Sequence, residues 1–125
     1  MESFAVAAYL CYMPVADAYA EPIIQAVLAD EAEHLDYGER WLAAWYPEVA
    51  APMAACCERA LPTVLAILQA ARSDLKAIGI DPVALVGEFV GCFQEATERV
   101  GFEPRQARRL VTRLAGKAAE LVPLR

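Results

Sequence analysis

The chain has 125 residues, of which 58% are hydrophobic, and a formal net charge of −6. This length is sufficient for one domain with its own hydrophobic core, so we expect residues 1–125 to form a single domain. The negative charge argues against a nucleic-acid binder, because phosphate groups repel such a chain. Much of the apolar content is alanine, the best helix former, and alternating strand patterns are missing. The sequence therefore predicts an all-α protein.

The apolar composition does not predict a membrane span. The longest uncharged run covers residues 3–16, which is too short to cross a bilayer and contains Pro14. The start, Met1-Glu2, lacks the basic residues of a signal peptide, since the first base is Arg40. We expect a cytoplasmic protein without a membrane span, whose four cysteines are buried free thiols rather than disulfides or zinc ligands.

Prolines near helix starts, capping residues and glycines near helix ends divide the chain into about five expected helices. The expected ranges are about 2–19, 22–45, 48–77, 82–100 and 104 to near 123. Pro14 is expected to kink the first helix, and Pro52 and Pro62 to kink or break the third. Asp81 is the expected cap of the fourth.

The second expected helix contains Glu31 three residues before His34. Positions three apart share one helix face, so the carboxylate and the imidazole can reach the same point. Glu-x-x-His is typical of di-iron sites in four-helix bundles, which use two such motifs and two single glutamates. A hydrogen-bonded Glu–His pair without a metal has the same spacing. The expected inward face runs through Ile24, Val27, Glu31, His34, Gly38, Trp41 and Trp45, with Glu33, Asp36 and Arg40 outward.

Glu2 is the candidate for a single glutamate ligand. In two antiparallel helices, residues are level with each other when they are equidistant from the turn. The midpoint between Glu2 and Glu31 falls at residues 16–17, within a segment bounded by Pro14 and Pro22. Each carboxylate would then lie about 14 residues, or roughly 21 Å, from the turn. This spacing is compatible with one shared metal site.

The C-terminal segment has the opposite charge from the rest of the chain. Residues 99–125 hold seven bases against Glu103 and Glu120, whereas residues 1–50 hold nine acids against Arg40 alone. The simplest interpretation of the basic segment is a solvated helix face. The alternative is a docking site for an acidic partner such as a small electron-transfer protein.

Four segments occur together at separations typical of one enzyme family: Phe4–Tyr9, Met13–Ala18, Asp30–His34 and Gly38–Leu42. In these segments the chain resembles the C-terminal half of the cyanobacterial aldehyde-deformylating oxygenases, also called fatty aldehyde decarbonylases. The similarity continues through Leu61-Pro62, Gly79-Ile80 and Val100-Gly101-Phe102 without a shift in register, so that it covers essentially the whole chain.

The resemblance implies a ferritin-like di-iron fold. It also implies the conversion of long-chain fatty aldehydes to an alkane and formate, with dioxygen and electrons that a ferredoxin-type donor usually supplies. By this resemblance Glu2, Glu31 and His34 are iron ligands, Phe4 and Tyr9 lie near the substrate channel, and Asp30 orients a ligand through a hydrogen bond.

The chain departs from the family pattern by lacking the N-terminal helices, which carry a further Glu and a further Glu-x-x-His. We therefore expect a partial ferritin-like bundle with three of the six protein ligands. In one hypothesis, activity needs a homodimer or a separate N-terminal half-protein that completes the site. In the other, the chain is a truncated, catalytically inactive helical scaffold or a binder of apolar ligands.

Overall fold

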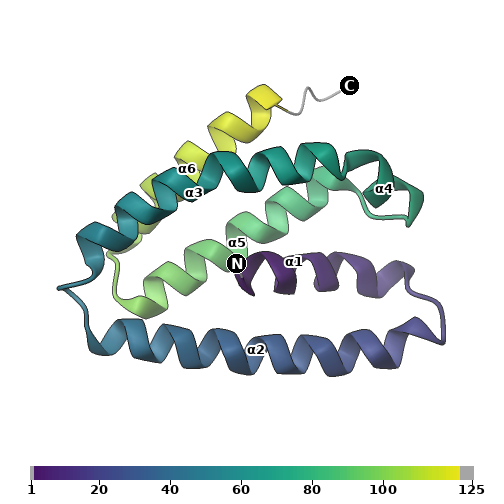
Figure 1. Ribbon diagram of the computed structural model, residues 1–125, viewed down its shortest axis with the longest axis horizontal. Coiled ribbons are helices and arrows are strands. Elements are labelled where there is room, and N and C mark those ends of the chain that lie inside the picture. Colours follow the sequence, from purple (N-terminus) through teal and green to yellow (C-terminus); the bar gives the residue numbers. More distant parts are fainter. Residues whose placement is uncertain (1, 122–125) are drawn as a thin grey trace.

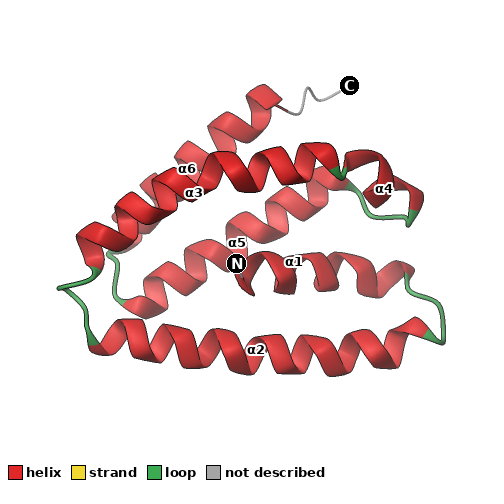
Figure 2. Cartoon of the chain, viewed as in Figure 1, coloured by secondary structure: helices red, strands yellow, loops and turns green. Residues whose placement is uncertain are grey.

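The structure is a computed structural model that describes the backbone of residues 2–121 and the side chains in this range except residues 2, 61, 114, 115 and 117–121. This part of the chain contains helices and no strand, and short connections join them (Figure 2). The helices are α1 (Glu2–Tyr12), α2 (Ala20–Ala44), α3 (Ala50–Ala70), α4 (Arg72–Ala77), α5 (Pro82–Val100) and α6 (Pro104–Leu121), with a short 3₁₀ turn, η1 (Met13–Val15). The predicted all-α class is confirmed.

Helices α1 and α2 run antiparallel beside each other (Figure 1). The connection between them contains residues 16–17, where the sequence placed the turn. The first helix is shorter than expected, because η1 contains Pro14 and the backbone becomes extended at Ala16. Asp17 then accepts hydrogen bonds from the backbone N–H groups of Tyr19 and Ala20 at 3.0 and 2.8 Å. These bonds stabilise the start of α2, which begins two residues before the expected Pro22.

The expected third helix does divide in two, but not at a proline. Pro52 lies in the first turn of α3, where a missing N–H leaves no hydrogen bond unmade. Pro62 lies inside α3, and the break comes at Ala71, before α4. Packing outweighs the cost of a proline within the helix, because the residues that follow it are core residues: Val64, Leu65 and Leu68.

Helix α5 has its predicted bounds. The side chain of Asp81 accepts the N–H of Val83 at 3.0 Å, and Pro82 is the first helical residue. Gly101 ends the helix with φ +124°, a conformation that residues with a Cβ rarely adopt. Local signals alone therefore place both ends of this helix.

Two hydrophobic clusters form the core. The larger cluster joins α1, α3 and α5, and its buried residues are Ala7, Val64, Leu65, Leu68, Ile80, Leu85 and Phe89. The smaller cluster joins the end of α5 to α6, and its buried residues are Val100, Phe102, Ala107 and Leu110. In Figure 1, α2 lies along the outside of α1 and α5 and contributes little to either cluster.

Helix α3 is long and apolar enough, by length and composition, to cross a membrane, with a mean hydropathy of 1.3 in its most apolar window. No other helix in residues 2–121 meets this criterion. Core helices of helical bundles also meet it, and α3 supplies three core residues while pairing Glu58 with Arg113. Only 12% of that window is buried inside the bundle, so most of the apolar surface of α3 faces outward among the described residues.

Candidate metal centre and apolar pocket

The Glu-x-x-His pair lies in the middle of α2, so a continuous helix positions both side chains on one face. Glu31 is half-buried and His34 is exposed, with its side chain at the edge of a pocket. A carboxylate and an imidazole are donors that suit iron and leave coordination positions open.

The start of α1 reaches the same pocket. Ser3 is buried, and both Ser3 and Phe4 line the cavity that His34 also lines. The turn between the helices thus brings Ser3 and Phe4, the residues that follow Glu2, to the pocket that His34 also lines. The side chain of Glu2 itself lies outside the described residues, so its role as a ligand stays a prediction.

Among the described side chains, no group of three or more His, Cys, Asp or Glu residues lies close enough together to hold one metal ion. Glu31 and His34 are the predicted donors on α2 and Glu2 the predicted third, and these roles stay predictions. In donor chemistry this set fits half of a carboxylate-bridged di-iron site. The remaining ligands would have to come from outside the part of the chain described here.

The pocket has a volume of about 440 Å³, within the range usual for small-molecule sites. Four helices supply its walls: α1, α2, α3 and α5. The lining residues are Ser3, Phe4, His34, Leu35, Gly38, Glu39, Leu42, Met53, Cys56, Cys57, Ala60, Val64, Phe89, Phe93, Ala96, Thr97 and Val100.

Three phenylalanines form a continuous aromatic wall. Phe4 meets Phe89 edge to face with ring centres 5.6 Å apart, and Phe89 lies 5.9 Å from Phe93. Phe4 thus lies on the pocket wall. By contrast, Tyr9 is half-buried and does not line the pocket, and Asp30 is exposed with no hydrogen bond to another described side chain.

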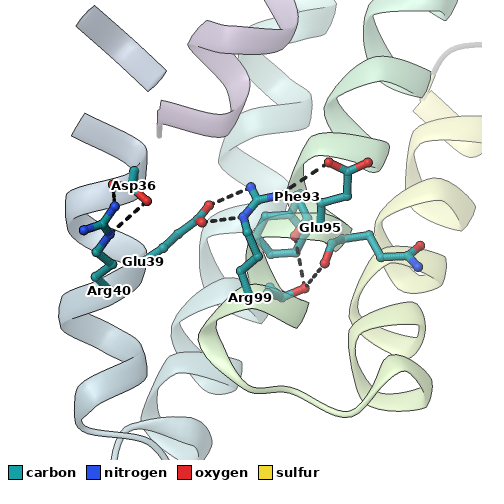
Figure 3. A network of polar contacts seen from close by, with 8 residues as sticks. Asp36, Glu39, Arg40, Phe93, Glu95 and Arg99 are labelled. Atoms are coloured by element: carbon teal, nitrogen blue, oxygen red, sulfur yellow. Dashed lines mark hydrogen bonds and ion pairs between the residues drawn. The ribbon is translucent and has the colours of Figure 1, made fainter. Parts of the chain in front are cut away.

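Two polar groups of the pocket wall, those of Thr97 and Glu39, are already hydrogen-bonded within the protein. The Thr97 hydroxyl lies 3.0 and 2.8 Å from the carbonyl oxygens of Phe93 and Gln94. Glu39, which is 8% exposed, accepts two hydrogen bonds from Arg99, at 2.5 Å from Nε and 2.9 Å from Nη2 (Figure 3). The cavity therefore presents a mainly apolar surface to a ligand.

Arg99 lies at the centre of a polar network between α2 and α5. Its guanidinium bonds to Glu39 across the helices and lies 3.5 Å from Glu95 on its own helix (Figure 3). The hydrogen bond to Glu39 raises the pKa of Arg99 above its ordinary value, so the guanidinium stays protonated throughout the physiological pH range. This bond fixes α2 against α5 beside the pocket.

The expected inward face of α2 is partly wrong. Ile24 is buried as predicted, but Trp41 and Trp45 are each 55% exposed, and Glu39 points into the bundle instead. Leu35 and Leu42, seven residues apart, both line the pocket, and Glu39 lies between them on the same face. That spacing was visible in the sequence and would have identified Glu39 as an inward residue.

The four cysteines are free, as predicted, but none is fully buried. Cys56 is exposed and Cys57 half-buried, and both line the pocket from α3. Burial, followed by the proximity of Cys56, raises the pKa of the Cys57 thiol above its ordinary value. Cys57 is therefore a neutral thiol at pH 7, and it reacts with alkylating reagents only at alkaline pH, where part of it becomes thiolate.

A helical bundle that carries Glu-x-x-His on one helix, with the histidine lining an apolar pocket, is typical of the ferritin-like proteins. Residues 1–116 match the model of a family described as long-chain fatty aldehyde decarbonylase. This chain belongs to that family.

A solved structure gives the same result. It is "Protein 19 with aldehyde deformylating oxidase activity" from Synechococcus, which is 53% identical in sequence and superimposes with a TM-score of 0.87. The match covers 90% of this chain and 51% of that protein. The chain thus spans about half the length of this relative, and the overall fold is that of the corresponding part of a ferritin-like bundle.

Proposed function

We propose that this chain provides the C-terminal half of an aldehyde-deformylating oxygenase, which converts a long-chain fatty aldehyde to an alkane and formate. The observation that carries the proposal is the shared position of His34 and the apolar pocket, because this reaction needs an iron ligand beside a site for an alkyl chain. In the proposal, Glu31, His34 and Glu2 bind iron, and a ferredoxin-type protein supplies electrons. Iron bound there would supply the reduction of dioxygen.

The pocket residues account for the substrate class. Phe4, Phe89 and Phe93 exclude water and pack against an alkyl chain. The ion pair with Arg99 neutralises the charge of Glu39 at the pocket wall. Each further methylene group that fits the cavity adds about 0.8 kcal/mol, or about fourfold in affinity. The proposal therefore includes a preference for long aldehydes over short ones.

The incomplete ligand set makes assembly part of the proposal. Either two copies of the chain or this chain and a separate N-terminal half would bring a second set of ligands to Glu31 and His34. Support comes from the exposed aromatic side of α2, where Tyr37, Trp41 and Trp45 are 74%, 55% and 55% exposed. We place the assembled protein in the cytoplasm.

A second candidate function is favoured by the pocket alone. The cavity needs no metal in order to hold an apolar ligand, so the chain could bind fatty compounds as an inactive ferritin-like scaffold. The two functions differ in whether His34 is needed for metal binding.

The test measures iron per chain and mass in solution after anaerobic reconstitution with ferrous iron, alone and with the N-terminal half of the Synechococcus relative. We expect about one iron per copy of this chain in a homodimer and about two per copy with the N-terminal half, and a loss of iron in His34→Ala. The matched control is Glu33→Ala, which removes an exposed acid from the same helix and should keep the iron.

Pocket occupancy is measured as protection of Cys57 from iodoacetamide by a long-chain alkane, at alkaline pH in a Cys56→Ser background, with peptide mass mapping to separate Cys57 from Cys11 and Cys92. His34→Ala should leave this protection unchanged, because the alkyl site is apolar. A chain that takes up no iron in any assembly but still shows protection would reject the oxygenase proposal and support the apolar-ligand binder.

A further inference from the structure

The outer side of α6 gathers four arginines around one hollow. Arg105, Arg108, Arg109 and Arg113, together with Thr112, line a cavity of about 370 Å³. Their spacing of three and four residues places them along one side of the helix. The opposite side packs against the bundle, and its buried residues are Ala107, Leu110 and Val111. We call the four arginines and Thr112 the arginine face.

Helix stability does not favour this arrangement. Residues four apart on a helix are neighbours, and like charges at such positions repel each other. Elsewhere in the chain this spacing joins opposite charges, in the pairs Asp36–Arg40 and Glu95–Arg99. On α6 the pairs Arg105–Arg109 and Arg109–Arg113 join like charges. Because folding gains nothing from this repulsion, the cluster points to a role outside the fold.

Three of the four arginines of the arginine face have no counter-charge among the described side chains. Arg113 forms an ion pair with Glu58, but within the described side chains Arg105, Arg108 and Arg109 form none. Arginine is suited to carboxylate or phosphate oxygens, because its planar guanidinium donates two parallel hydrogen bonds. The face is therefore prepared to receive an anion.

The chemistry of the surroundings selects among anionic partners. A basic amphipathic helix binds a membrane by inserting its apolar side, but the apolar side of α6 is buried in the core. An extended polyanion such as a nucleic acid would also meet the rest of the chain, whose net charge is −6. A folded protein can bring a compact group of carboxylates to the hollow and keep the remainder of its surface away.

We propose that the arginine face is the docking site of an acidic protein surface. The docking site shares no residue with the apolar pocket and includes neither Glu31 nor His34. Binding can therefore be measured on the iron-free chain, and its failure is distinguishable from failure of the oxygenase proposal.

The experiment follows the binding of fluorescently labelled poly-L-glutamate to the full chain by fluorescence anisotropy. We expect saturable binding that weakens by about tenfold between roughly 50 and 200 mM salt. The variant Arg105→Gln/Arg108→Gln/Arg109→Gln should bind at least about tenfold more weakly, because the charges that attract the carboxylates are gone. The control variant, Arg59→Gln/Arg72→Gln/Lys76→Gln, changes the net charge equally and should bind as the parent does.

A second measurement separates docking from folding. Removing three like charges should leave the melting temperature of the docking variant unchanged or raise it, since Gln is also a good helix former. The proposal is overturned if poly-L-glutamate does not bind, if both variants lose binding equally, or if polyphosphate or phosphatidylglycerol vesicles bind through the arginine face while poly-L-glutamate does not. It is also overturned if the docking variant loses its helical circular dichroism together with binding.

Discussion

The two partners of the Glu39–Arg99 ion pair differ in exposure. The side chain of Glu39 is 9% exposed and that of Arg99 is 50% exposed. Water can therefore solvate Arg99 if Glu39 is removed, but it can reach Glu39 only with difficulty if Arg99 is removed. A buried carboxylate without a partner is among the more costly single defects in a protein.

We therefore predict an asymmetry between two variants. Arg99→Met should lower the free energy of unfolding by roughly 2–4 kcal/mol, whereas Glu39→Gln should lower it by about half of that. Urea denaturation followed by circular dichroism measures both. Arg40→Met removes the exposed pair with Asp36 and should change stability by less than about 0.5 kcal/mol. Equal losses in Arg99→Met and Glu39→Gln would show that the carboxylate is not desolvated.

At the level of the elements, the sequence predicted best the helices whose ends are marked by capping residues, prolines or glycines. Asp81, Pro82 and Gly101 define α5 without reference to any other helix, and both predicted ends are correct. Pro62 was misjudged because a proline acts locally, whereas Val64 and Leu65 stabilise α3 through contacts with other helices. Helix boundaries that depend on tertiary packing cannot be predicted from the residues at the boundary alone.

The same distinction applies to the candidate site. The start of α1 and His34 line one pocket, and helix geometry with one turn was sufficient to predict from sequence spacing that these segments lie near each other. Which side of α2 faces the bundle depends on what the other helices cover. The side with Trp41 and Trp45 carries large aromatic side chains, yet this chain leaves it exposed, and Glu39 lies inside because Arg99 is there to bind it.

Two glycines, one at the end of α5 and one inside it, test whether the backbone conformation at Gly101 requires glycine. Gly101 has φ +124°, and a Cβ there would lie 3.0 Å from the ring of Tyr46. Gly91 lies within α5, and a Cβ there would meet no atom within 4 Å. Gly101→Ala should therefore lower the free energy of unfolding by about 1–3 kcal/mol, and Gly91→Ala should raise it by roughly 0.5–1 kcal/mol.

Thermal denaturation followed by circular dichroism measures these changes in the folded chain. The two variants add the same methyl group at the end and in the interior of one helix. Changes of opposite sign in the free energy of unfolding would therefore be due to the backbone conformation at each position. A stabilising Gly101→Ala would mean that α5 does not end in a positive-φ turn against Tyr46.

On the scale of the whole molecule, different faces of the surface expose different kinds of side chain. The outer side of α2 exposes aromatic rings, α6 exposes arginines, and the pocket lies between α1, α2, α3 and α5. A stable single chain would rarely leave several large apolar side chains together in water. The relative from Synechococcus, of which this chain matches 51%, has further chain that could cover such a surface.

The only two tryptophans, Trp41 and Trp45, report directly on whether the outer side of α2 becomes covered. Their rings lie 6.2 Å apart and both are half-exposed, so the dilute chain alone should show red-shifted emission that acrylamide quenches. Burial by a second copy should shift the emission to the blue and reduce quenching as concentration rises, with a doubling of mass. Burial by an N-terminal half should produce the same blue shift and reduced quenching when the two polypeptides are mixed in equimolar amounts.

The surface variant Tyr37→Ser lies on the same side of α2, one turn before Trp41, and should weaken the association that shifts the emission. The control Val83→Ser removes an exposed apolar side chain from α5 and should leave the association unchanged. Emission that is already blue and unquenched in a dilute monomer would show that the rings are buried within the single chain. In that case the second set of iron ligands would have to approach from another side, because the aromatic side of α2 would no longer be free to receive it.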